Sequence, residues 1–239
     1  MKKEIGGYFE LEDLAGKEYY PGLYKVNLGR TALLWLLESR RYSKIYLPMF
    51  LCESVVEACD QHGIQIERYR MDAELNILLS QNKMKEKECL YLVNYYGQLT
   101  DERILQYKEK YGNIIVDHTH AFFQKPLKGI DTLYSCRKFW GVSDGAYLAT
   151  DAVLSMDKPL DRSNKRMEHI LGRYEENAGA YYQEMLQNAA SYDGMEIRRM
   201  SRLTENLLGA IDYEAGKHRR EENYSILFEE LPSESVFVR

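Results

Sequence analysis

The segments Cys89-Leu-Tyr-Leu-Val-Asn-Tyr95, Asp101 to Tyr111 and Asn113-Ile-Ile-Val-Asp117 decide the fold. The first and the last are nearly continuous apolar runs, the pattern of strands buried on both faces of a parallel sheet. The charged middle segment has the length of a surface helix. A strand, a helix and a second strand in this order predict a right-handed βαβ unit.

The same alternation continues on both sides of this unit. Val26 to Leu37 contains a glycine and a threonine before an apolar run of helical length, which indicates a loop that opens into a helix. Further strands are predicted at Lys44 to Pro48, Ile64 to Tyr69, Thr132 to Ser135 and Ala146 to Ala149, and a further helix at Ser54 to Gly63. This pattern over residues 26 to 150 predicts an α/β fold: a three-layer α/β/α arrangement with a mostly parallel central sheet. The long, charged, helix-prone stretches Ser163 to Gln187 and Ser201 to Leu231 predict a helical C-terminal part.

The composition narrows the class of protein. Of the 239 residues 45% are hydrophobic and 29% are charged, enough apolar material for a substantial core. A net charge of −5 does not favour nucleic-acid binding, which usually needs a basic face. No apolar run is long enough to span a membrane, and the N-terminus lacks the apolar stretch of a signal peptide. Four scattered cysteines without a CxxC pair favour a reduced, cytoplasmic setting over a disulfide framework.

Polar residues end several of the predicted strands. Asn94, Asp117 and Ser135 each occupy such a position, and Gly29 to Thr31 opens the first helix. Ligands of open α/β sheets bind beyond the carboxyl ends of the strands, so we expect these residues to converge in space. Gly29-Arg30-Thr31 is a candidate phosphate cradle, because free backbone N–H groups and the helix dipole favour an anion. The alternative is that Asn27 or Thr31 merely caps the helix.

Asp117 follows a buried strand, where a carboxylate is costly unless a cation pairs with it. A protonated heteroaromatic ring nitrogen is one such cation, and His120, three residues later, could contact the same ligand. A metal held by Asp117, His118 and His120 is an alternative that we do not favour, because no further histidine or cysteine lies nearby at ligand spacing.

Lys138 lies beside Arg137 among aromatic and apolar residues. A lysine next to another cation and apolar surface loses its proton more easily, as an amine must before it attacks a carbonyl. The alternative is an ordinary basic loop. An anion site at a helix start, a strand-end carboxylate and a downstream lysine together suit pyridoxal phosphate, with Ser135 as a second phosphate contact.

Five segments resemble the DegT/DnrJ-type nucleotide-sugar aminotransferases, which are fold-type-I pyridoxal-phosphate enzymes. They are Asn27-Leu-Gly-Arg-Thr-Ala32, Leu47-Pro-Met-Phe-Leu-Cys52, Val93-Asn-Tyr-Tyr-Gly97, Asp117-His-Thr-His-Ala-Phe-Phe123 and Ser135-Cys-Arg-Lys-Phe-Trp-Gly-Val-Ser-Asp-Gly-Ala146. The Asp-x-x-His and Ser-x-x-Lys segments are fairly specific in this order and context, and each alone is weak. The resemblance implies the large domain of that fold.

The resemblance also implies roles for individual residues. Lys138 would hold the cofactor as a Schiff base, and Asp117 would pair with its ring nitrogen. His120 matches a residue near the cofactor hydroxyl, and Cys52 stands where many members place an aromatic residue against the ring. The phosphate contacts match Gly29, Arg30, Thr31 and Ser135. Two departures are the small Cys52 side chain and a shorter spacing from Ser135 to Lys138 than is typical.

For the whole protein the resemblance implies a homodimeric aminotransferase, with glutamate as amino donor and a nucleotide-linked keto-sugar as acceptor, in polysaccharide or sugar biosynthesis. Residues 1–210 would form the cofactor-binding large domain, and residues 211–239 a connecting helix and the beginning of a small C-terminal domain that is otherwise missing. The alternative is a catalytically incompetent module that binds the cofactor or a partner. A dinucleotide-binding enzyme is disfavoured, because no G-x-G-x-x-G follows the first predicted strand.

Overall fold

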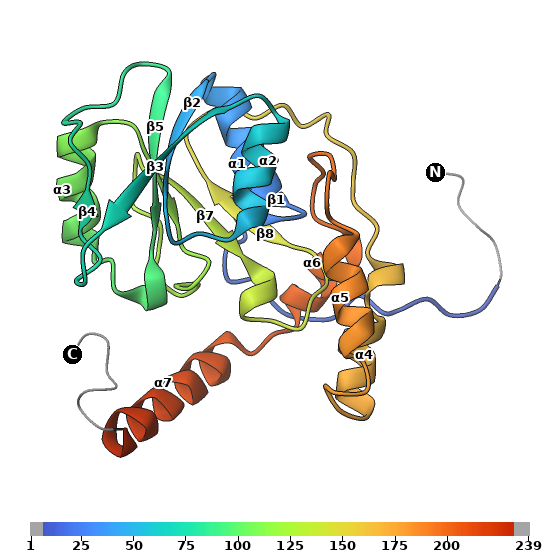
Figure 1. The fold of residues 1–239 in the computed structure, drawn as a ribbon. Coiled ribbons are helices and arrows are strands. Elements are labelled where there is room, and N and C mark those ends of the chain that lie inside the picture. The colour runs from blue at the N-terminus through green and yellow to red at the C-terminus, as the bar shows by residue number, and fades with distance from the viewer. Residues whose placement is uncertain (1–6, 232–239) are drawn as a thin grey trace.

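The computed structural model describes residues 7–231, and a mixed sheet of eight strands forms its centre (Figure 1). The strands are β1 (Tyr24–Val26), β2 (Lys44–Pro48), β3 (Gln65–Met71), β4 (Ile77–Leu78), β5 (Glu88–Val93), β6 (Ile114–Asp117), β7 (Asp131–Ser135) and β8 (Ala146–Ala149). Their order across the sheet is β1-β8-β7-β6-β5-β2-β3-β4. The five central strands, from β7 to β3, pair in parallel, and β8 and β4 pair antiparallel with their neighbours. The predicted mostly parallel sheet is therefore confirmed.

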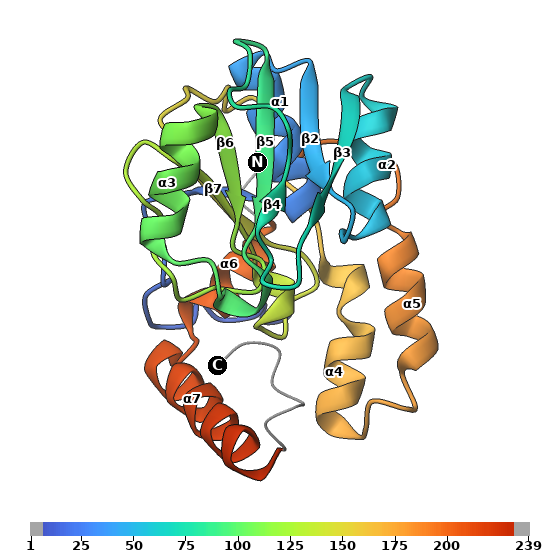
Figure 2. The same cartoon turned by 60° about the vertical axis from the view of Figure 1, so that its left-hand side comes forward.

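Helices cover both faces of this sheet, as the three-layer prediction requires. On one face lie α1 (Gly29–Arg40) and α2 (Glu53–Gln61), and on the other lies α3 (Asp101–Tyr111) (Figure 2). Because side chains alternate along a strand, neighbouring residues of one strand enter different cores. Ile45 and Tyr91 pack with α1, whereas Tyr46 and Leu90 pack in the cluster beneath α3. The two cores hold the parallel strands rigidly in register.

A third core lies where the helical C-terminal part meets the sheet. It is rich in aromatic side chains, with Phe122, Tyr134 and Tyr147 fully buried. The remaining helices are α4 (Glu168–Glu175), α5 (Tyr182–Ala190), α6 (Arg202–Gly209) and α7 (Tyr213–Glu230), and η1 (Tyr95–Gly97), η2 (Cys136–Lys138) and η3 (Asn164–Arg166) are single 3₁₀ turns. Helix α7 projects from the body of the molecule (Figure 1). Within residues 7–231 no helix is both long and apolar enough to cross a membrane.

The two long helix-prone stretches are each divided in the structure. Ser163 to Gln187 contains η3, α4 and the start of α5, and Ser201 to Leu231 contains α6 and α7. The Asp212 side chain accepts a hydrogen bond from the Ala215 N–H and so begins α7 as a separate helix. The predicted strand from Cys89 also ends earlier, at Val93, because Tyr95–Gly97 forms η1. The short strands β1 and β4 were not predicted.

Candidate functional site

The carboxyl edge of the parallel strands brings the predicted residues together. Asp117 ends β6 and Ser135 ends β7, and these strands are parallel neighbours in which Asp117 pairs with Leu133. Gly29 begins α1, and a Cβ atom placed on Gly29 would lie 3.9 Å from the Ser135 Cβ. Residues from three separate parts of the sequence therefore meet at one edge, the position where α/β proteins bind ligands.

The start of α1 has open backbone N–H groups. Its N-cap is Leu28, and no cap side chain hydrogen-bonds to this turn within the described residues 7–231. The first-turn N–H groups of a helix have no partner inside the helix, so Gly29 and Arg30 can offer theirs to an anion. The Thr31 hydroxyl is already occupied: it donates to Asn27 Oδ1 at 2.6 Å and accepts from the Leu28 N–H at 3.2 Å. Thr31 thus stabilises the turn itself, as the capping alternative expects.

Asp117 is a buried carboxylate with two hydrogen-bond donors. The Tyr91 hydroxyl donates to it at 2.7 Å, and the Thr119 N–H donates at 2.7 Å. Burial raises the pKa of Asp117, and these hydrogen bonds and the nearby His120 oppose that shift. A cation bound at this carboxylate would lower the pKa again, because it favours the ionised form. The position therefore suits a positively charged ring nitrogen.

Aromatic rings line the same edge, and apart from His120 the sequence analysis did not single them out as site residues. The Tyr96 ring stacks on the His120 ring with 5.6 Å between centroids, and Phe50 stacks on Tyr95 at 5.4 Å. Phe50 and Tyr96 are 63% and 64% exposed, and Tyr96 has a left-handed backbone with φ of 55°. Both residues follow closely after strand ends, the same signal that selected Asn94. They offer flat surfaces on which a planar ligand could stack.

Cys52 lies between β2 and α2, two residues after Phe50. It is the N-cap of α2, and its exposed Sγ lies 3.1 Å from the Ser54 Oγ. An aromatic ring nearby in sequence is supplied by Phe50, whose backbone oxygen accepts a hydrogen bond from the Tyr95 hydroxyl.

Lys138 is the last residue of η2 and is exposed. Within residues 7–231 its side chain forms no ion pair or hydrogen bond, and Ser135, half-buried at the start of the same turn, has a free hydroxyl. The turn itself is fixed, because the Cys136 N–H donates to the Gly145 carbonyl and the Trp140 N–H to the Cys136 carbonyl, both at 3.0 Å. A free primary amine is thus held on an anchored turn beside the α1 start.

His118 packs inside the protein and has a structural role. It is buried, its ring lies 5.4 Å from that of Tyr134, and its Nδ1 lies 3.1 Å from the Asn94 Nδ2. Burial lowers the pKa of His118 from 6.5 to about 4. Asn94, which follows β5 directly and is the N-cap of η1, also accepts a hydrogen bond from the Leu99 N–H at 2.8 Å and so holds the turn that presents Tyr96. Among the described residues, no group of three or more His, Cys, Asp or Glu side chains is arranged to hold a metal.

The lowered pKa of His118 predicts a pH-dependent stability. The unfolded chain takes up a proton near pH 6.5 and the folded chain only near pH 4, so the stabilisation is fully present above pH 6.5 and is lost as the pH falls toward 4. At 1.36 kcal/mol per pKa unit, we expect a loss of about 3 kcal/mol over this window. Urea unfolding of wild type and of His118→Gln at several pH values measures it. A difference between the two proteins that does not change with pH would contradict the assignment.

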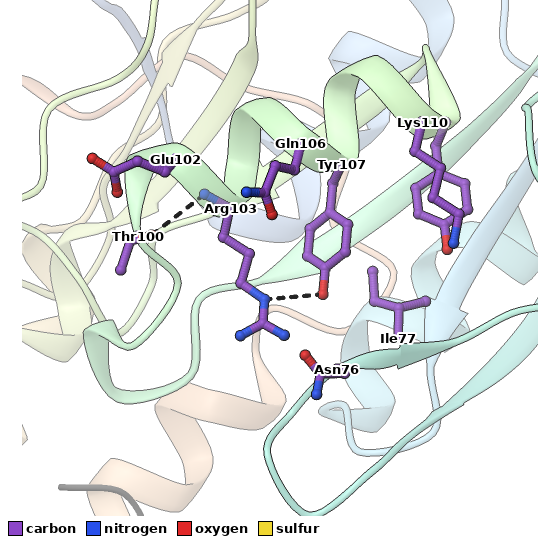
Figure 3. A pocket seen from close by; sticks show the side chains of 9 residues that line it. Asn76, Ile77, Thr100, Glu102, Arg103, Gln106, Tyr107 and Lys110 are labelled. Atoms are coloured by element: carbon purple, nitrogen blue, oxygen red, sulfur yellow. Dashed lines mark hydrogen bonds between the residues drawn. The ribbon is translucent and has the colours of Figure 1, made fainter.

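A separate hollow of about 400 Å³ lies along α3. Arg103, Tyr107 and Lys110 line it from the helix, facing Asn76 and Ile77 across the opening, and Arg103 Nε donates to the Tyr107 hydroxyl at 3.3 Å (Figure 3). None of the predicted site residues lines this hollow. It is therefore distinct from the strand-end site.

The fold and the site define an α/β protein in which the start of α1, the buried Asp117 and the turn that carries Lys138 lie at the carboxyl edge of the sheet. Among solved structures, the chain is similar to the sugar aminotransferase CalS13 from Micromonospora echinospora, with 18% identity, a TM-score of 0.43 and coverage of 54% of this chain and 42% of that one. The chain is also similar to NtdA from Bacillus subtilis, solved with its bound cofactor PMP. The identity is 14%, the TM-score is 0.46, and the match covers 55% of this chain and 33% of NtdA. A third similar structure is DesV from S. venezuelae, in complex with a ketimine intermediate. The identity is 16%, the TM-score is 0.43, and the match covers 54% of this chain and 39% of DesV.

The match covers less than half of each of these solved chains. The chain spans about two fifths of the CalS13 and DesV chains and one third of NtdA. No protein-family model matches the sequence, and neither does any curated protein sequence.

Proposed function

We propose that the chain binds pyridoxal phosphate through Lys138 and acts as an aminotransferase-like protein. One observation carries this proposal: the open first turn of α1, the buried Asp117 and the turn that carries Lys138 lie at the same edge of the sheet. A phosphate, a pyridine nitrogen and an aldehyde require these three kinds of group. In this proposal residues 1–210 form the cofactor-binding unit, and residues 211–239 form a connecting helix and the beginning of a small C-terminal domain.

The first turn of α1, Asp117 and Lys138 together fit pyridoxal phosphate. When bound, this cofactor would act as an electron sink for bonds at the substrate α-carbon. Asp117 is buried and accepts hydrogen bonds from the neutral Tyr91 hydroxyl and Thr119 N–H, so it has capacity for a cationic N–H. The Lys138 Nζ serves as the base that moves the proton of the substrate α-carbon. The stacked Tyr96 and His120 rings offer a flat surface against which the ring of the cofactor would lie.

We propose amino transfer from glutamate to a nucleotide-linked keto-sugar, in a homodimer. Support comes from the sequence segments that resemble nucleotide-sugar aminotransferases, and the solved structures reported above include sugar aminotransferases. A second candidate is a module that holds the cofactor but does not transfer amino groups. The exposure of Phe50 and Tyr96 favours it, because an open site admits water to the reacting groups.

Amino transfer is tested with purified protein saturated with pyridoxal phosphate. We expect a visible absorption band, which glutamate converts to the spectrum of the amino form of the cofactor with release of 2-oxoglutarate. Asp117→Asn should slow this conversion by about a hundredfold or more, because the ring nitrogen loses its charged partner. A band that glutamate leaves unchanged would favour the module, and protein without any band would contradict both candidates.

A further inference from the structure

Three arginine side chains gather around the ring of Tyr192. The guanidinium carbons of Arg137 and Arg166 lie 4.5 and 5.0 Å from the ring centroid. Arg30, the second residue of α1, forms an ion pair of 3.3 Å with Asp193, the residue next to Tyr192. Cations from α1, from η2 and from η3 therefore meet at one place.

Only two of these three cations have a carboxylate partner. Arg166 pairs with the buried Asp161 at 2.7 Å, and Arg30 pairs with the exposed Asp193. Arg137 is half-buried, and within residues 7–231 its guanidinium group has neither an ion pair nor a hydrogen bond. Burial lowers the pKa of Arg137, and the charges of Arg30 and Arg166 lower it further, whereas Tyr192 and the Asp144 carboxylate oppose this shift in part. A cation removed from water is costly unless an anion compensates it, so the cluster has a place for a negative charge.

The position of Arg137 connects this cluster with the candidate cradle. Arg137 lies between Ser135 and Lys138 in the turn η2. Ser135 is the residue whose Cβ would lie 3.9 Å from a Cβ on Gly29, at the start of α1. An anion there would meet the open N–H groups of α1, the free Ser135 hydroxyl and the guanidinium fork together. A phosphate dianion carries enough charge and enough acceptor oxygens for all three.

We propose that Arg137 binds a phosphate group of the ligand at the start of α1, with the Tyr192 ring holding its guanidinium in place. The cofactor's phosphate ester and a substrate's diphosphate share this chemistry, and the assignment to either source rests on the proposed function. Two neighbours of the cluster agree with this role. The Tyr192 hydroxyl is hydrogen-bonded to the Ser143 carbonyl, which fixes the ring, and burial together with the Arg137 charge lowers the pKa of His169.

The first experiment measures binding of inorganic phosphate by calorimetry in a Lys138→Ala background, where covalent cofactor attachment cannot occur. We expect Arg137→Gln to weaken phosphate binding by about ten- to a hundredfold, the loss of one charge-assisted contact. Arg162→Gln is the matched control, because it removes an exposed guanidinium near the cluster and should leave the affinity unchanged. Equal phosphate affinity with and without the Arg137 side chain would overturn the proposal.

A measurement of thermal stability excludes a purely structural role. Removing an uncompensated half-buried cation should leave the unfolding temperature of the phosphate-free protein unchanged or raise it. Arg137 is a packing residue, and the proposal fails, if two results are found together. Arg137→Gln lowers the unfolding temperature of the phosphate-free protein, and added phosphate does not change the unfolding temperature of the wild type.

The second experiment identifies the source of the phosphate. Wild-type protein is loaded with pyridoxal phosphate and reduced with borohydride, and inorganic phosphate and pyrophosphate are titrated again. Loss of phosphate binding after loading assigns Arg137 to the cofactor phosphate, whereas retained binding that still depends on Arg137 assigns it to a substrate phosphate. Because the first experiment lacks Lys138, failure of the proposed cofactor attachment leaves its phosphate result intact.

Discussion

Lys138→Ala should abolish covalent attachment of pyridoxal phosphate and, with it, the visible absorption band. The wild-type side chain is exposed and has no partner within residues 7–231, so its amine is free to attack an aldehyde. The turn that carries it is anchored through Cys136 and Gly145, so the amine keeps its place beside Ser135. Any amino transfer should fall by at least about a hundred- to ten-thousandfold, because the proton-transferring base is lost as well.

Lys128→Ala is the matched control for this experiment, since Lys128 is another exposed lysine that follows β6 in sequence. It should keep the band. Borohydride reduction followed by peptide mass mapping then shows which lysine carries the cofactor. A label on Lys128 or on any lysine other than Lys138 would contradict the assignment, as would a band that survives in Lys138→Ala.

Asp144→Ala should destabilise the fold by about 4 kcal/mol. This carboxylate is 0% exposed and accepts three hydrogen bonds, from the Ser201 N–H at 2.8 Å, from the Ser201 hydroxyl at 2.7 Å and from the Thr204 hydroxyl. Removing it leaves three buried donors, each of which costs about 1–3 kcal/mol when it lacks an acceptor. The bonds join the loop after Lys138 to the start of α6, so the turn η2 should loosen too.

Urea unfolding followed by circular dichroism measures this loss. Asp60→Ala serves as control, because Asp60 is exposed at the end of α2 and its removal should change stability by less than about 0.5 kcal/mol. A loss below about 1 kcal/mol for Asp144→Ala would mean that the donors find other acceptors, such as the Ser163 hydroxyl, which lies 2.7 Å from that of Ser201.

Several elements were predicted well from the sequence. The helix Asp101 to Tyr111 and the strands Lys44 to Pro48 and Ala146 to Ala149 have the predicted bounds. The two strands are short apolar runs that are buried almost throughout, the pattern of central strands. The strands β1 and β4 were missed, since two or three residues carry no period. The long stretch from Ser201 was divided by the Asp212 cap, a local hydrogen bond that helix propensity alone does not reveal.

The candidate site was predicted in part. Strand ends pointed to Asp117 and Ser135, since the carboxyl ends of parallel strands share an edge. The same signal did not separate Tyr96 from its neighbours, because its exposure depends on a left-handed turn after β5. Arg137 was noted only as the cation beside Lys138.

By itself, the sequence determined the α/β class, the mostly parallel sheet and the lysine on which the proposed function depends. The sheet could be predicted because the apolar pattern of a strand is a local property of the chain. Lys138 stood out because a second cation, Arg137, and aromatic residues are its neighbours in the sequence. Only the tertiary structure decided which side chains surround that lysine. Thr31 turned inward to Asn27, and Arg137 met Arg30, Arg166 and Tyr192, since contacts between distant segments depend on how helices pack on the sheet. Charge compensation, and hence the place for an anion, is a property of that packing.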